Sequence, residues 1–216
     1  GDSLLNFLEN VKLEHDVNLT DARFPVQYVI RPQSDELHDY RGYAGKIISG
    51  IYRVGDAVTI QPAGIESRIA SIELAGKKVE EAFAPQSVVI HLEDDIDISR
   101  GDVMVRSDNQ PSISQDLDVL ICWMDSKPLM PGNKYLLQIN SRRVKSVVKE
   151  IEYKLDVNTL EKSGSPEKAV LNDIIRAKVK TAAPVPYDAY RKLRANGGAI
   201  LIDETSHVTV GACMIQ

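Results

Sequence analysis

The feature that most constrains the fold is a succession of short β-like runs along almost the whole chain. Stretches such as "FPVQYVI" place apolar residues two apart, and turn-forming residues follow every ~8–12 residues. A pattern of this kind is typical of β-barrels and β-sandwiches. Long helical periodicity is missing after the first few residues. The sequence therefore predicts an all-β protein.

The strand pattern is interrupted at residues 106–116, "RSDNQPSISQD", where polar turn-formers surround Pro111. Short strands are predicted on both sides of this segment, and the pattern restarts at "DVLICWM". A chain of 216 residues is long enough for two small domains. We predict two tandem β-barrels, at residues 23–108 and 109–216. Within the second, "NGG" at 196–198 is interpreted as a strand-to-strand turn.

Residues 1–22 precede the barrels and begin with a helical pattern, "GDSLLNFLENVKL". Asp2 or Ser3 can cap a helix. Apolar residues then recur at helical spacing, at Leu4, Leu5, Leu8 and Val11. A short N-terminal helix is predicted.

Composition narrows the environment and the partners. The formal net charge of −5 argues against a general nucleic-acid binder. No apolar run approaches the ~20 residues of a membrane span, so we expect no membrane partner. Cys122 and Cys213 both lie in apolar runs, which indicates buried free thiols and a cytoplasmic location.

A glycine-rich stretch, "RGYAGKIISGIYRVGDAVTI" at residues 41–60, invites comparison with a phosphate-binding loop. Such a loop needs G-x-x-x-x-G-K-[ST] before a helix, whereas "GYAGKI" has the wrong spacing and ends in Ile47. The glycines instead suit β-structure. Gly42 and Gly45 allow a tight entry to a strand, Gly50 marks a bulge or a close backbone approach, and Gly55 takes a turn conformation.

Other residues with chemical potential do not assemble into a site. "DIDIS" lacks the glycine and glutamate of a calcium loop, and no nucleophile motif occurs. The histidines are far apart in sequence, at His15, His38, His91 and His207. We therefore predict no catalytic, cofactor-binding or metal-binding residues in this chain.

Basic residues gather in three groups of the second half of the chain. The simple interpretation is a solvated face, and the alternative is a docking surface for an acidic partner or phosphates. The groups are Arg142, Arg143, Lys145 and Lys149; Arg176, Lys178 and Lys180; and Arg191, Lys192 and Arg194.

Several blocks together resemble a known family. They are "RFPVQYVIRP", "RGYAGKIISGIYRVGDAVTIQPAG", "EEAFAPQSVVIHLEDDIDISRGDVMV", "WMDSKPLMPGNKYLLQI", "EYKLDVNTLE" and "TSHVTVGACMI". They are similar to sulfate adenylyltransferase subunit 1, the GTPase subunit of bacterial ATP sulfurylase. The first two blocks also resemble the second domain of the elongation factor Tu superfamily. The resemblance covers nearly the whole chain.

The resemblance implies an order of domains in which a GTPase domain precedes two barrels, similar to the second and third domains of elongation factor Tu. Residues 1–22 look like the end of that GTPase domain, with Asp2 where the family usually has proline. On this basis the chain is expected to be a C-terminal fragment without a cofactor of its own. GTP and Mg2+ would bind the upstream domain, and ATP would bind the partner subunit.

The family's activity forms adenylylsulfate and pyrophosphate from ATP and sulfate, and GTP hydrolysis drives it. The resemblance therefore implies a non-catalytic scaffolding and coupling role in a heterodimer with the small nucleotidyltransferase subunit. As a hypothesis, Arg41, Gly42, Tyr43 and Gly45 form a loop that contacts the GTPase domain or the partner. The residues have no local role that the sequence reveals.

Two other readings remain open at this point. The barrels of a translation elongation factor would hold aminoacyl-tRNA, with steep salt dependence. A stand-alone β-barrel binding module would have no enzyme attached. The net acidity and the sulfurylase-like blocks argue against the first of these.

Overall fold

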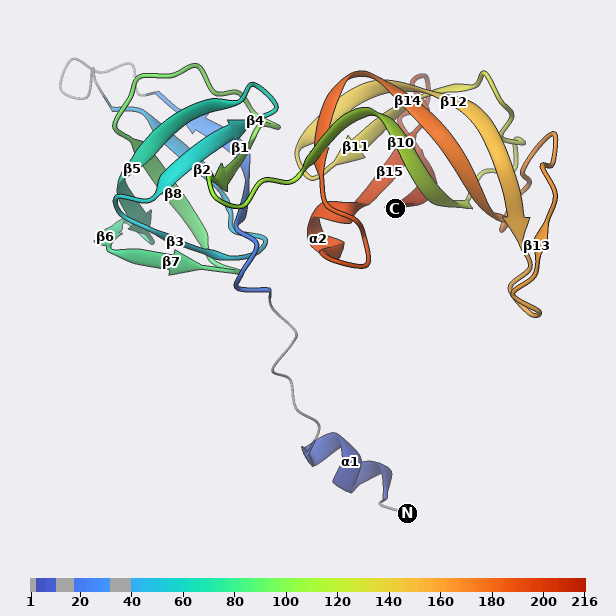
Figure 1. Ribbon diagram of the computed structural model, residues 1–216, viewed down its shortest axis with the longest axis horizontal. Helices are drawn as coiled ribbons and strands as arrows, with labels where there is room; N and C mark the ends of the chain where they lie inside the picture. The colour runs from blue at the N-terminus through green and yellow to red at the C-terminus, as the bar shows by residue number, and fades with distance from the viewer. Residues whose placement is uncertain (1–2, 11–17, 32–39) are drawn as a thin grey trace.

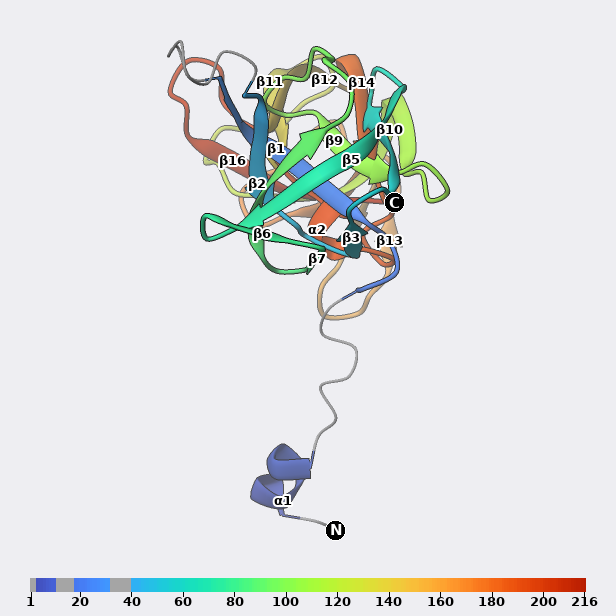
Figure 2. The same cartoon turned by 90° about the vertical axis from the view of Figure 1, so that its left-hand side faces the viewer.

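The computed structural model describes residues 3–10, 18–31 and 40–216. Within these residues the strands form two barrels that lie side by side (Figure 1). In the view turned by 90°, the first barrel lies in front of the second (Figure 2). The predicted all-β class with two tandem barrels is confirmed.

The first barrel closes because β4 pairs with both β9 and β5. The strand order β4-β9-β1-β2-β8-β5 therefore returns to its start, with every pairing antiparallel. β6 extends the sheet beyond β5, and β3 pairs with β7. The strands are β1 Arg23–Ile30, β2 Gly42–Lys46, β3 Ile51–Arg53, β4 Ala57–Gln61, β5 Ile65–Leu74, β6 Lys77–Val79, β7 Glu81–Phe83, β8 Ser87–Leu92 and β9 Val103–Arg106.

Inward-facing residues of these strands fill the first barrel. Phe24 and Tyr52 pack edge to face with ring centroids 6.2 Å apart. The Tyr52 hydroxyl donates a hydrogen bond to the Met104 carbonyl at 2.7 Å, which satisfies a polar group buried in the core. At Gly50 (φ +78°), a Cβ would lie 2.3 Å from the Cα of Ala22, so the predicted close backbone approach is confirmed.

The second barrel closes in the same way, because β11 pairs with both β15 and β12. Its strand order is β11-β15-β16-β10-β14-β12, with the short β13 beside β12. The elements are β10 Ser112–Trp123, β11 Lys134–Ile139, β12 Arg142–Leu155, β13 Lys162–Ser163, β14 Ile174–Tyr187, α2 Arg194–Gly197, β15 Gly198–Ile202 and β16 Thr209–Ile215.

Aromatic packing anchors the core of the second barrel. Trp123 and Tyr135 meet edge to face at 5.6 Å, and the Trp123 Nε1–H donates to the Lys127 carbonyl at 2.8 Å. Cys213 is buried and free as predicted. Cys122 is free but partly exposed, because alternate residues of β10 face outward.

The predicted N-terminal helix is α1, Leu4–Asn10. The Ser3 Oγ accepts a hydrogen bond from the Asn6 N–H at 3.2 Å and so caps the helix. Asp2, the alternative capping residue, and Val11, the last apolar position of the predicted helix, lie outside the described residues. α1 stands apart from both barrels in Figures 1 and 2.

Two local predictions differ from the structure. β10 begins at Ser112, so the connection between the barrels is only residues 107–111. The strand-to-strand turn expected at 196–198 is wrong, because Asn196 and Gly197 end the helical turn α2. Asn196 is buried there. Its side-chain amide donates to Asp188 at 2.8 Å, and its Oδ1 accepts from Asn140 at 2.8 Å.

Candidate interaction surfaces

The described residues hold neither a metal-binding cluster nor a helix that could span a membrane. Within residues 3–10, 18–31 and 40–216, no group of three or more His, Cys, Asp and Glu side chains is placed to hold a metal ion. None of the helices in those ranges has the length and apolarity to cross a membrane. The candidate features of the two barrels are contacts and surfaces.

Three of the four residues expected to form a contact loop lie in strand β2 instead. Tyr43 is only 1% exposed, and its hydroxyl donates to the Ile96 carbonyl at 3.0 Å. A Cβ at Gly45 would lie 2.5 Å from the carbonyl oxygen of Pro25, so this glycine permits close strand packing. The expectation of a loop at Gly42–Gly45 is wrong, and Tyr43 is a core residue.

Arg41, the fourth of these residues, precedes β2 and keeps part of its side chain at the surface. Its Nη1 donates to the Ile96 carbonyl at 3.0 Å, and the guanidinium forms an ion pair with Asp95. The side chain is 26% exposed. Its role in contacting a partner remains a proposal, and Arg41 is the member of the set that is placed to fulfil it.

A buried ion pair joins the two barrels. Arg23 of β1 donates from Nε to Oδ2 of Asp188 at 2.8 Å and from Nη2 to Oδ1 at 2.9 Å. The two residues are 165 positions apart and are 0% and 4% exposed. The remaining Nη1 donates to the carbonyls of Ala22 and Asn109 and to the Asn109 side chain. The bidentate geometry and these extra bonds compensate for the desolvation of both charges.

A second carboxylate extends this network. Asp21 accepts hydrogen bonds from Asn18 at 2.9 Å, from Asn109 at 3.0 Å and from Lys192 at 3.0 Å. Burial alone would raise the pKa of Asp21, but these hydrogen bonds outweigh it and hold the pKa at about 2. Asn109 belongs to the connection between the barrels, and its bonds to Arg23 and Asp21 hold that connection against the first barrel. Lys192 of the second barrel joins the same network through Asp21.

The barrels also touch at a separate edge. The Ser141 hydroxyl donates to the Val26 carbonyl at 2.9 Å, and Arg142 lies 3.4 Å from Asp102. A Cβ at Gly101 would come within 3.0 Å of the Cα of Arg142. The two barrels are thus held at two places and form one unit.

Half of the ten basic residues noted in the sequence form ion pairs within the chain: Arg142, Arg176, Lys178, Lys180 and Lys192. Arg176 binds Asp118 from its Nε at 2.8 Å, and Lys178 binds Asp118 at 3.0 Å and Glu152 at 3.1 Å. The hydrogen bond from Arg176 is the main cause that lowers the pKa of Asp118. Lys192 and Arg142 pair across the barrel contact, as described above. These residues do not form an open basic face for nucleic acid.

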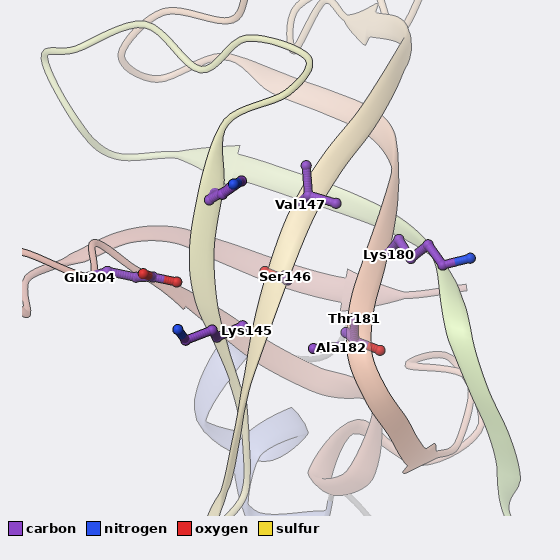
Figure 3. A pocket seen from close by; sticks show the side chains of 8 residues that line it. Lys145, Ser146, Val147, Lys180, Thr181, Ala182 and Glu204 are labelled. Atoms are coloured by element: carbon purple, nitrogen blue, oxygen red, sulfur yellow. The ribbon is translucent and has the colours of Figure 1, made fainter.

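A pocket on the second barrel brings other lysines together. It has a volume of about 500 Å³ and opens over β11, β12 and β14. Three of the residues that line it are lysines (Figure 3). The full lining is Lys134, Lys145, Ser146, Val147, Lys180, Thr181, Ala182 and Glu204. The sequence had placed Lys145 and Lys180 in different basic groups and had not singled out Lys134. Only the strand register brings the three together.

Comparison with known proteins now gives these surfaces a context. A family model described as "GTP-eEF1A C-terminal domain-like" matches residues 116–216. The bifunctional enzyme CysN/CysC of Mycobacterium tuberculosis is 43% identical over 216 residues, which are 100% of this chain and 35% of that protein. Sulfate adenylyltransferase subunit 1 of Aliarcobacter butzleri is 40% identical over 216 residues, covering 100% of this chain and 45% of that protein.

Over its whole length, this chain is similar to proteins named sulfate adenylyltransferase subunit 1. The subunit of Teredinibacter turnerae is likewise 43% identical over 215 residues, covering 99% of this chain and 45% of that protein. The chain spans less than half the length of these curated relatives.

Solved structures of lower sequence identity have a similar fold. A crystal structure of sup35 complexed with GMPPNP has a TM-score of 0.82 at 20% identity, covering 100% of this chain and 51% of that one. Translation elongation factor SelB from Methanococcus maripaludis, in its apo form, has a TM-score of 0.70 at 17% identity, covering 99% and 45%. At these identities the likeness shows the double-barrel fold alone.

Proposed function

We propose that this chain is the C-terminal barrel region of the GTP-hydrolysing regulatory subunit of ATP sulfurylase. In this role it helps to form adenylylsulfate and pyrophosphate from ATP and sulfate. The barrels are not catalytic. They hold the GTPase domain and the small nucleotidyltransferase subunit in a fixed relation, within a heterodimer in the cytoplasm. GTP and Mg2+ bind the GTPase domain, and ATP binds the small subunit.

The observation that carries this proposal is the 40–43% identity to sulfate adenylyltransferase subunit 1 and CysN/CysC proteins over the entire chain. The rigid joint between the barrels agrees with a scaffolding role, because a scaffold must keep its two contact surfaces at a constant separation. The ion-paired state of Arg176 and Lys178 argues against the alternative, in which the barrels hold aminoacyl-tRNA.

The test uses the full-length gene product, co-expressed with the nucleotidyltransferase encoded in the same genome. Sulfate-dependent release of pyrophosphate from ATP is measured with and without GTP. We expect release that requires sulfate and is stimulated by GTP, and a non-hydrolysable GTP analogue as control should not sustain the stimulation. Absence of release from well-folded subunits would refute the proposal, and a tRNA gel shift would then test the translation alternative.

Arg41 provides a finer test of the contact between the barrels and their partners. We expect Arg41→Ala to weaken binding of the small subunit or the GTP stimulation, with little effect on folding because the side chain is partly exposed. Tyr43→Ala serves as a contrast, because it should destabilise the first barrel itself. Unchanged assembly and stimulation in Arg41→Ala would remove Arg41 from the interface.

A further inference from the structure

The lysine-rimmed pocket is built by strand register. Lys134 of β11 lies opposite Val147 of β12, and Val147 lies opposite Lys180 of β14. Directly paired residues of neighbouring strands share one face of the sheet. Lys145 lies two positions before Val147 and therefore shares that face as well. The register thus places three lysines around a single apolar residue on the outer surface of the barrel.

The charge of this rim is largely uncompensated. Among the described residues, no carboxylate lies within 4.0 Å of the ammonium of Lys134 or Lys145, and Lys180 reaches Asp116 only at 3.7 Å. Glu204 is the acidic residue of the lining and lies on the Lys145 side of the pocket (Figure 3). On β14, the strand that carries Lys180, Arg176 and Lys178 are paired with Asp118 and Glu152. The rim therefore keeps a net positive charge.

The floor of the pocket differs from its rim. Val147 and Ala182 supply apolar atoms. The Ser146 hydroxyl donates to the Tyr135 carbonyl at 3.0 Å, and the Thr181 hydroxyl donates to the Ala183 carbonyl at 2.8 Å. Because these hydroxyl protons are already committed, the floor offers no free hydroxyl donor to a small anion.

We propose that this pocket receives an acidic segment of the small nucleotidyltransferase subunit. An apolar side chain of that segment sits on Val147 and Ala182, and flanking carboxylates meet the lysines. This inference rests on the proposed function, and it names where the partner binds.

The geometry favours a protein segment over a phosphate group. A phosphate site gathers convergent N–H donors, often from backbone amides. Here the Lys180 side chain extends away from Lys145, so the charges stand apart across the pocket (Figure 3). An apolar centre within a charged rim is the usual anatomy of a protein–protein contact. Rim charges of this kind mainly raise the association rate and fix the orientation of the partner.

The first experiment reverses the charge of the rim in the full-length regulatory subunit. Lys134→Glu, Lys145→Glu and Lys180→Glu are combined, and affinity for the small subunit is measured by biolayer interferometry at low and high salt. The control combines Lys77→Glu, Lys78→Glu and Lys168→Glu, which are exposed lysines outside the pocket with the same total charge change. We expect the pocket variant to bind about tenfold more weakly at low salt, with a smaller difference at high salt.

The second experiment fills the floor without changing charge. Ala182→Trp should weaken binding at least about threefold at all salt concentrations, because it occupies the space for the incoming apolar side chain. Ala57→Trp, at another exposed alanine, should have no effect. Circular dichroism shows whether each variant is folded. If the triple lysine variant does not fold, the single variant Lys145→Glu is used in its place.

The possible results distinguish a wrong binding site from a wrong proposed function. If the wild-type subunits bind and release pyrophosphate, but pocket variants match their controls, the site is refuted and the proposed function stands. If the wild-type subunits neither bind nor react, both fall. If a pocket variant loses tRNA binding but keeps the small subunit, the surface serves RNA and the proposal is overturned.

Discussion

Two arginine–aspartate pairs in this chain share one chemistry and differ in surroundings. Arg23 and Asp188 form a bidentate pair between the barrels, 0% and 4% exposed. Arg176 and Asp118 form a bidentate pair on the outer face of the second barrel, 30% and 25% exposed. The first pair joins residues of different domains, and the second joins neighbouring strands.

Both pairs have bidentate geometry, so their different burial determines how much stability is lost when a pair is broken. The exposed pair remains in contact with water, so losing it costs little, and its main effect is to cancel positive charge. The buried pair has given up its hydration. Removal of one partner would leave the other charged and unpaired in the protein interior.

The largest expected effect is therefore at the barrel joint. Asp188→Ala should lower the free energy of unfolding by about 3–5 kcal/mol, because Arg23 and the Asn196 amide lose their acceptor. Guanidinium denaturation of the 216-residue chain measures this. We also expect a single transition to separate into two, as the barrels lose their coupling.

A double variant sharpens this test. Arg23→Met combined with Asp188→Leu removes both charges and should recover part of the lost stability, because no unpaired buried charge remains. Equal stability of the wild type and Asp188→Ala would show that the buried pair does not hold the barrels together.

Acid should weaken the same joint through Asp21. Its pKa is about 2 in the folded chain, below the ordinary 3.8, so its contribution is complete above about pH 4 and is lost as pH falls through 2. The loss amounts to about 2 kcal/mol. Stability measured from pH 5 to 2 should fall more steeply in the wild type than in Asp21→Asn. Parallel profiles would contradict this assignment.

At the exposed pair the effect should be smaller. Asp118→Asn should cost no more than about 1 kcal/mol, and the difference should shrink in 1 M salt because surface charges are screened. Thermal denaturation at low and high salt checks this. A loss as large as that in Asp188→Ala would remove the distinction between the two pairs.

The smallest effect concerns reactivity rather than stability. Burial raises the pKa of the Cys213 thiol to about 12, whereas Cys122 faces outward from β10. In the folded chain iodoacetamide should modify Cys122 first, and Cys213 only on unfolding. Peptide mass spectrometry over time follows both sites, and equal rates would refute the difference.

The barrels could be predicted from the sequence because strand periodicity and turn chemistry are local. Gly55 illustrates this, since its positive φ belongs to the turn in which it lies. The glycines of "RGYAGKI" suggested a loop, whereas Tyr43 lies in a strand and is buried in the core. Glycine spacing alone does not distinguish a turn from closely packed strands.

The candidate surfaces could not be predicted in the same way. Arg23 and Asp188 are 165 positions apart, and nothing local marks either as buried. The lysine pocket depends on register across β11, β12 and β14, which a one-residue shift would abolish. Both features arise from pairing between distant segments, which local patterns do not encode.

The short connection at residues 107–111 has a mechanical consequence. Asn109 is bound by Arg23 and Asp21, and Arg23 in turn binds Asp188 of the second barrel, so bending at this connection would break these contacts. A displacement applied to the far end of one barrel must then move the other barrel with it. While these contacts hold, a force on one barrel is passed to the other, as along a single lever arm.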